Sequence, residues 1–276
     1  LERSDAKGLM HLTVHWGLIV VVGGLIMAEV PGWQVLMVVQ GLLVIFCFTL
    51  LHETVHKTPF ATEWLNEAVM HICGFLVILP PEHFRYFHLA HHRFTNDPEK
   101  DPELAGEKVS TWPRYLWRIT GIPIWREHIG QLLKNAAGRA DDDFLPEGRK
   151  VRVRLEARIM VALYLTLGLV LAMGHSWLFW CWLGPALLGQ PFLRLYLMAE
   201  HGRCPPVANM LENTRTTFTN QLVRRLAWNM PYHAEHHAMP MVPFHKLPEL
   251  HQRTKTHLRM TEDGYGAFHR KFTRDF

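Results

Sequence analysis

Residues 232–237 read Tyr-His-Ala-Glu-His-His and carry histidines at positions i, i+3 and i+4. On an α-helix these positions fall within about 100° of arc, so the three imidazoles point the same way. Residues 88–92 (His-Leu-Ala-His-His) repeat this spacing, and residues 52–56 (His-Glu-Thr-Val-His) place two histidines on one face. Because imidazole is the commonest neutral metal ligand, the three clusters predict a metal site. The eight histidines are His52, His56, His88, His91, His92, His233, His236 and His237.

The composition favours a membrane protein of one domain, residues 1–276. Hydrophobic residues make up 49% of the chain and are gathered in long runs. The net charge is +4, but the basic residues flank the apolar runs instead of forming a stripe, which favours a membrane over nucleic acid as the partner. The cysteines form no Cys-x-x-Cys pair, so neither a disulfide framework nor a cysteine metal site is expected. They are Cys47, Cys73, Cys181 and Cys204.

Four apolar runs predict an all-α, multi-pass fold with four transmembrane helices. A helix needs about 20 apolar residues to cross a hydrocarbon layer of ~30 Å. The runs form two hairpins, which turn at residues 29–32 and 174–176. Pro185 and Pro191 are expected to kink the last run. The four runs are residues 9–30, 33–51, 159–173 and 177–198.

Two further segments are expected near the membrane surface. Residues 68–80 are apolar but too short to span, which predicts a re-entrant or interfacial helix. His71 within it has no partner at ligand spacing, so we expect it to have a structural or supporting role. Residues 114–133 mix tryptophan, arginine and aliphatic residues, as a helix in the head-group region would. An amphipathic helix of a soluble cap fits that composition equally well.

Charge asymmetry predicts the orientation of the chain. The two hairpin turns contain no lysine or arginine, whereas both ends and the long middle segment contain many. By the positive-inside rule those basic parts are cytoplasmic. All three histidine clusters then lie in one cytoplasmic helical cap, and the protein is an integral membrane protein with its active site on that face.

A ninth histidine, His201, ends the last apolar run in the motif Glu200-His201-Gly202. Its simplest role is that of a helix-terminal cation favoured by the helix dipole. Its position beside the first cluster instead predicts a metal ligand. Nine imidazoles exceed what one metal can use, but they suit two metals with four or five each. Iron, zinc, copper and nickel all accept imidazole, so ligand type leaves the metal open.

The motifs HETVH (52–56), HLAHH (88–92) and HAEHH (233–237) resemble the three histidine boxes of membrane fatty-acid desaturases and the related alkane and lipid hydroxylases. The continuations HHRFTNDPEKDPE (91–103) and EHHAMPMVPFHKLP (235–248) are similar to the runs that follow the family's second and third boxes. The resemblance reaches from the first hydrophobic hairpin to about residue 250. His201 occupies the place of a further ligand that the family has at the end of its last membrane helix.

This resemblance implies a cap that holds two Fe ions (a non-haem di-iron centre) beneath which an alkyl or lipid substrate binds. It implies activation of O2 and removal of hydrogen from an unactivated C–H position, with an alkene or an alcohol as product. Acidic residues near the boxes are expected to orient imidazoles, although solvated or helix-capping roles fit them equally well. They are Glu53, Asp97, Asp101, Glu200 and Glu235.

Arg194 is the one charged residue expected deep in the last apolar run, seven residues before His201. An arginine at that depth snorkels to the interface or faces the bundle interior. Arg194 is therefore a candidate for contact with a polar group of the substrate or with a buried acid.

Two other function classes fit part of the pattern. Residues 52–56 also match H-E-x-x-H, the signature of zinc metalloproteases with Glu53 as general base. A membrane metalloprotease would need one further ligand, which leaves the other two clusters without a role. A histidine-rich metal-binding or transport protein would explain the ligands but not the hydrophobic hairpins. Iron content together with O2 consumption would distinguish the oxidoreductase from both.

The sequence predicts dependence on an external electron donor. Each turnover requires two electrons, and the chain carries neither a cysteine motif for an iron–sulfur or rubredoxin-type centre nor a haem-binding signature. A ferredoxin, rubredoxin or cytochrome b5 type partner, acidic enough to be drawn to the basic cytoplasmic face, is expected to supply them. Sustained turnover of the purified chain with NAD(P)H and O2 alone would contradict this expectation.

Overall fold

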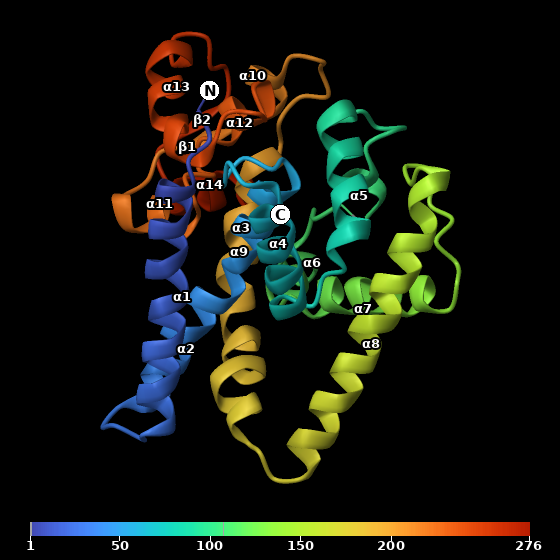
Figure 1. Ribbon diagram of the computed structural model, residues 1–276. Helices are drawn as coiled ribbons and strands as arrows, with labels where there is room; N and C mark the ends of the chain where they lie inside the picture. The colour runs from blue at the N-terminus through green and yellow to red at the C-terminus, as the bar shows by residue number, and fades with distance from the viewer. Residues whose placement is uncertain (1, 107) are drawn as a thin grey trace.

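Two pairs of long helices turn at the same end of the molecule, and the C-terminal segments gather at the opposite end (Figure 1). The computed structural model describes residues 2–106 and 108–276. Among these residues the only strands are β1 (Thr216–Thr217) and β2 (Thr261–Glu262), which pair in parallel. The predicted all-α class is confirmed.

The first pair consists of α1 (Asp5–Met27) and α2 (Trp33–Ile45), which continues into α3 (Cys47–Val55). The side chain of Ser4 caps α1 by accepting a hydrogen bond from the backbone N–H of Lys7. Gly32, at φ +82°, allows the sharp turn into α2. α3 then carries the first histidine cluster to the upper end of the pair in Figure 1.

The second pair consists of α8 (Lys150–Ala172) and α9 (Gly184–His201), with Gly174 at φ +97° in the turn between them. The turn leads into η3 (Phe179–Leu183), a short π-helix that directly precedes Pro185. Pro191 lies inside α9 without ending it. Most of α8 is exposed along its apolar length, as expected of a surface that faces lipid.

Within residues 2–106 and 108–276, three helical segments are long and apolar enough to cross a membrane: Asp5–Met27, Trp33–Val55 and Glu147–Ala172. α9 falls outside this class because Gln190, Arg194 and Glu200 lower its hydropathy. The pair α4 (Glu63–Leu76) and α5 (Pro81–Phe94) qualifies only as one broken span, bent by 101°. These apolar helices indicate membrane association, whereas the count of four spans stays a prediction.

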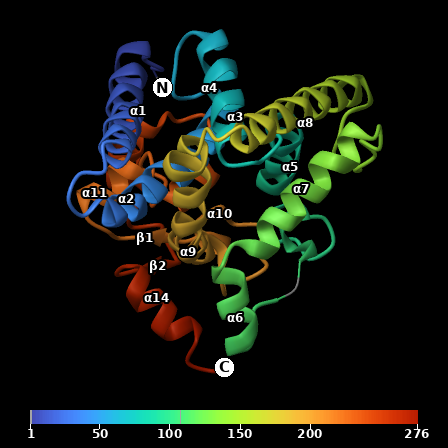
Figure 2. The same cartoon turned by 90° about the horizontal axis from the view of Figure 1, so that it is seen from below.

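The segment predicted to be re-entrant or interfacial lies in α4 and in the break that follows it. The predicted helix over residues 114–133 is instead two helices, α6 (Trp112–Ile119) and α7 (Ile122–Ala136), because the chain turns at Gly121 with φ +72°. α6 exposes Trp112, Leu116 and Trp117, in keeping with a place in the head-group region. α7 packs beside α8 in both views (Figures 1 and 2).

The cap, residues 202–276, packs over the ends of α3 and α9 and is built from short helices. Its main apolar contacts come from Trp228, Met230, Phe244 and Leu247, which are buried against residues of α3 and α4 in one core cluster. Its elements are α10 (Met210–Asn213), α11 (Gln221–Leu226), α12 (His233–Ala238), η4 (Phe244–Lys246), α13 (Leu247–Thr254) and α14 (Tyr265–Phe272). The short helices η1 (Pro102–Ala105) and η2 (Glu147–Arg149) lie in the middle segment.

The two helix pairs are held together by close packing of α2 against α9. A Cβ atom at Gly41 would lie 2.2 Å from the carbonyl oxygen of Pro185, and one at Gly189 would lie 2.3 Å from the carbonyl oxygen of Gly41. Glycine therefore lets the two backbones touch. This contact positions the ends of both helices, which carry His52 and His201.

We expect Gly41→Ala to lower the melting temperature of the purified protein, since the added methyl group forces the helices apart at a cost of about 1–3 kcal/mol. Gly17→Ala in α1 is the matched control, because a Cβ there meets no atom within 4 Å. The control is expected to melt at the wild-type temperature or slightly above it. Equal melting temperatures for the two variants would contradict the close-packing account.

Candidate metal centre

Four segments bring all nine predicted histidines together where the helix pairs meet the cap. His52 lies in the last turn of α3, and His56 directly follows that helix. α5 supplies the second cluster, α9 ends on His201, and α12 supplies the third. All of these side chains are buried or nearly so. The chain thus places helix-end residues from distant parts of the sequence in one small volume.

Five of the histidines form a first group, in which one ring nitrogen from each lies within 4.8 Å of the others. His56 Nε2 and His88 Nε2 are 3.0 Å apart. The ring centroids of His52 and His88 are 4.2 Å apart. The group consists of His52, His56, His88, His92 and His236.

His91, His201 and His237 form a second group under the same distance criterion. His91 Nε2 lies 3.2 Å from His201 Nε2, which in turn lies 3.1 Å from His233 Nε2. We therefore count His233 with this group. Five and four nitrogen donors match the four or five that the sequence predicts for each of two metals.

The i, i+3, i+4 spacing explains how one helix serves both groups. On α5, His88 and His92 face the first group while His91 faces the second. The rings of His92 and His237 stack at a centroid distance of 4.0 Å, so the groups are direct neighbours. The two groups therefore adjoin each other on one scaffold of helices.

The ring nitrogens fit bound cations. Both nitrogens of His52 and of His92, and Nε2 of His236 and of His237, are buried without a hydrogen-bond partner among the described residues. Unpaired buried polar atoms are costly, so their convergence calls for a positive ion. Burial also holds the pKa of His236 and His237 well below the usual value, with neighbouring histidines adding to the effect. Neutral imidazole is the form that binds metal.

Acidic side chains hold the outer nitrogen of several rings. Asp101 Oδ1 lies 2.9 Å from His91 Nδ1, and Glu103 Oε2 lies 3.0 Å from the same atom. A proton on Nδ1 leaves the Nε2 lone pair directed into the second group, as in the carboxylate–histidine–metal arrangement. Asp101 thus lies behind a histidine ring, as expected from the sequence. Glu103 contacts the same ring nitrogen, although the histidine motifs gave no reason to expect it.

Glu53 and Glu200 also lie behind rings, as expected from the sequence. A Glu53 oxygen is 3.5 Å from His236 Nδ1, and a Glu200 oxygen is 3.5 Å from His233 Nδ1. Glu53 is fully buried and also accepts hydrogen bonds from the Thr58 hydroxyl and the Phe244 backbone N–H. It therefore ties the first cluster to the loop that follows the third.

Glu235 and Asp97 do not orient any of the nine histidines. Glu235 lies two residues after His233, about 200° round the helix, and therefore faces away from the site. It contacts His251 Nδ1 at 2.5 Å and the Thr216 hydroxyl instead, which fastens α12 to its neighbours. The Asp97 carboxylate accepts a hydrogen bond from the Glu99 backbone N–H and stabilises the turn after α5.

Thr95 is a further contact that the boxes alone do not reveal. Its hydroxyl donates to the His91 backbone carbonyl at 2.8 Å and lies 3.1 Å from His237 Nδ1. The hydroxyl can therefore accept a hydrogen bond from Nδ1–H of His237, which leaves the Nε2 lone pair free for the second group. The conspicuous threonine three residues after His92 was the available signal for this role.

His71 joins Glu67 and Glu82 in a separate acidic cluster rather than either histidine group. Its Nδ1 lies 2.9 Å from Glu156, and Arg85 pairs with Glu67 at 2.8 Å. Arg152 lies 2.6 Å from Glu82, so arginines already pair with both glutamates of this cluster. The expected structural role of His71 agrees with these contacts.

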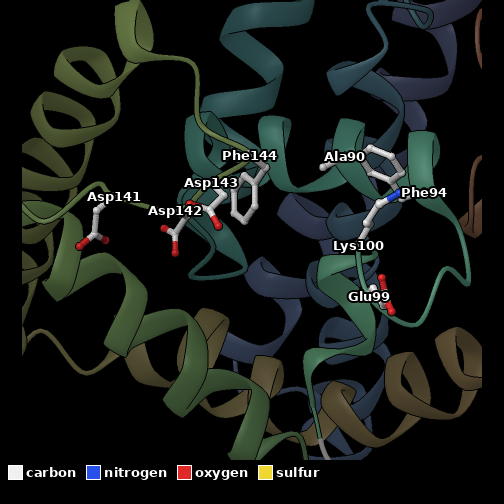
Figure 3. Close-up of a pocket in the computed structure, with 8 residues that line it drawn as sticks. All are labelled: Ala90, Phe94, Glu99, Lys100, Asp141, Asp142, Asp143 and Phe144. Atoms are coloured by element: carbon white, nitrogen blue, oxygen red, sulfur yellow. The ribbon is translucent and has the colours of Figure 1, made fainter.

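A depression of about 590 Å³ also lies away from the histidines (Figure 3). Ala90 and Phe94 of α5 line one side and Asp141 to Phe144 the other, with Lys100 and Glu99 nearby. Asp142 is paired with His83 and Lys134. None of the nine histidines borders this depression.

A cavity of about 340 Å³ is lined by residues of α3, α5 and α9 close to the two groups, although none of the nine histidines borders it. Phe48, Phe84, Phe87 and Leu197 line it, each four residues, or about one helical turn, before one of the histidines of α3, α5 or α9. The ring of Phe84 stacks on His88 at 5.4 Å. The cavity therefore has an apolar wall between its interior and the imidazoles. Arg194, the arginine expected at depth, is buried and lines the same cavity.

Comparison with known proteins adds independent information. Residues 31–269 match the family model described as fatty acid desaturase. The chain is similar to a Delta(12) fatty acid desaturase of Calendula officinalis, with 25% identity over 191 residues, which is 62% of this chain and 50% of that protein. The chain thus spans about half the length of the curated relative that it matches.

Replacing His201 tests whether it holds a metal. We expect His201→Gln to retain the helix end and near-normal expression but to lose about one of two metal ions per chain, because it removes one donor of the smaller group. Metal per chain is measured by elemental mass spectrometry. His175→Gln, in the exposed turn before α9, is the matched control and is expected to keep full metal content. Full metal content in the His201 variant would show that His201 has a structural role and is not a metal ligand.

Proposed function

This chain belongs to the fatty acid desaturase family, and we propose that it is an O2-dependent membrane oxidoreductase that oxidises an unactivated C–H position of an alkyl chain. Desaturation of a lipid is the reaction that the family match favours, with hydroxylation as the other product of the same chemistry. The residues proposed to hold two Fe ions are the nine histidines of the two groups.

The observation that carries this proposal is the convergence of nine buried imidazoles as two adjacent groups. Five nitrogen donors in one group and four in the other suit a pair of metal ions. Two iron ions, once bound there, would activate O2, which is the oxidant that takes hydrogen from an alkyl C–H bond with two electrons from the external donor. Imidazole ligation alone would also accept zinc or copper, so it is the family match that favours iron.

The chain's own side chains would orient the imidazole rings, cover them with apolar surface and position the alkyl chain of the substrate. Asp101 would fix the tautomer of His91 by accepting a hydrogen bond from its Nδ1–H, while oxygens of Glu200 and Glu53 lie 3.5 Å from His233 Nδ1 and His236 Nδ1. Phe48 and Phe84 cover the imidazoles from below with apolar surface. An alkyl chain in the 340 Å³ cavity would lie against these rings and would exclude water from the reacting carbon.

The membrane setting follows from the same proposal. With α1, α2–α3 and α8 in the bilayer, the histidine groups lie at the end of the helices away from the hairpin turns (Figure 1). The charge asymmetry of the sequence then gives the cap a cytoplasmic location. An external donor of ferredoxin, rubredoxin or cytochrome b5 type would deliver electrons to that face.

A zinc metalloprotease is the less favoured reading of residues 52–56. Its general base would have to reach water beside the metal. The Glu53 carboxylate is instead fully buried and engaged by Thr58 and Phe244. His52 and His56 also share their group with three more histidines, which leaves no open position for a peptide carbonyl.

Product analysis tests the proposal. We expect expression in a host with abundant membrane lipids to produce a new lipid species that has lost two hydrogen atoms, the mark of a new double bond. A gain of one oxygen atom would identify hydroxylation by the same centre. High-resolution mass spectrometry of extracted lipids distinguishes the two. His92→Ala is the matched inactive control, and new species that persist in that variant, or none in the wild type, would contradict the proposal.

A further inference from the structure

Arg194 is a buried cation without a partner. Its side chain lies in α9 and is 7% exposed. Among the residues that the structure describes, no hydrogen bond or ion pair engages its guanidinium, and its Nε is buried and unpaired. Burying a charge is unfavourable unless it is paired, so a residue of this kind marks a site for a missing anion.

Its surroundings place that anion in the cavity close to the histidine groups. Arg194 lines the 340 Å³ cavity together with Phe48 and Phe84. It stands seven residues before His201, about 10 Å along α9. A molecule in the cavity can therefore lay its apolar part against the aromatic rings while its polar end meets the guanidinium.

Other charged groups of the cavity do not satisfy Arg194. Glu103 and Glu127 line the rim and are exposed, and neither lies within ion-pair distance of Arg194 among the described residues. Glu103 instead contacts His91 Nδ1 at 3.0 Å. Arg118 adds a second guanidinium to the same cavity, so that its two arginines balance the two rim glutamates in charge.

We propose that Arg194 binds an anionic oxygen group of the substrate, a carboxylate or a phosphate, inside this cavity. The guanidinium fork matches both groups and forms charge-assisted hydrogen bonds with either. A neutral alkane, or the methyl end of a lipid whose head group stays in the cap, would leave the guanidinium desolvated and unpaired. The identification of the occupant as substrate rests on the proposed function; the anion site itself does not.

A binding experiment with the full chain as purified with its metal, in neutral detergent and without O2, tests this proposal. The probes are decanoate, decyl phosphate, decan-1-ol and decyltrimethylammonium, measured by equilibrium dialysis against detergent micelles alone. Both acids share one alkyl chain with the neutral and cationic probes. We expect the tighter acid to bind at least about 10-fold more strongly than the alcohol, since hydrogen bonds to charged groups have that effect. Whichever acid binds more tightly identifies the anionic group.

Variants assign the preference to one residue. Arg194→Gln is expected to weaken binding of the preferred acid by between about 10-fold and 100-fold while changing decan-1-ol binding little. Arg194→Lys should retain part of the preference, because it keeps the charge but loses the fork. Arg126→Gln is the matched control: it removes the same charge from an exposed position on α7 that does not line the cavity. It should keep the wild-type preference.

Equal affinity of wild type for the acids and the alcohol would overturn the inference, and this comparison requires no variant. The same losses in Arg126→Gln and Arg194→Gln would also overturn it, because they would reflect net charge alone. If the metal-loaded chain oxidises lipid while no acid preference exists, the inference fails and the proposed function stands. If Arg194 governs acid binding but the chain oxidises nothing, the anion site stands and the proposed function fails.

Discussion

The clustering of nine buried or nearly buried imidazoles with nitrogens that face one another is the constraint on which the rest of this structure depends. His56 and His88 approach to 3.0 Å through Nε2 atoms, and both nitrogens of His52 and of His92 lack a partner among the described residues. Such a cluster would be unfavourable without cations between the rings. The surrounding helices fix the positions of the ligand side chains, which lowers the reorganisation that metal binding requires.

The fold meets this constraint by ending helices at one level. The backbones of α2 and α9 touch at Gly41 and Gly189. This contact aligns the ends of α2–α3 and of α9 that carry the histidines. The 101° bend between α4 and α5 turns the second cluster back toward them. α12, which belongs to the cap, then covers both histidine groups. Glu235 anchors the far side of this helix. The same helices place apolar residues one turn below the histidines, so the cavity and the metal centre share one scaffold.

Much of this arrangement was predictable because helical periodicity is a local property. The one-face spacing of the three clusters predicts their convergence, and the position of His201 at a helix end predicts its place among them. What depends on tertiary direction was not predictable. Asp97 stands near His91 and His92 in sequence but points elsewhere, because it follows a turn at Asn96, where φ is +60°. Likewise α9 carries Gln190, Arg194 and Glu200 because it packs against other helices of the protein. These polar residues lower its mean hydropathy below the value used to recognise a membrane span. The orientation of Glu235, by contrast, was predictable, because helical periodicity alone turns it to the side of α12 opposite His233.

The central claim is that the two histidine groups each bind an iron ion. Its most direct test is the metal content of the full chain, purified from iron-replete cells without chelators and measured by elemental mass spectrometry against protein mass. The account predicts two iron ions per chain and no stoichiometric zinc. One zinc ion per chain with no iron, or no bound metal at all, would contradict it.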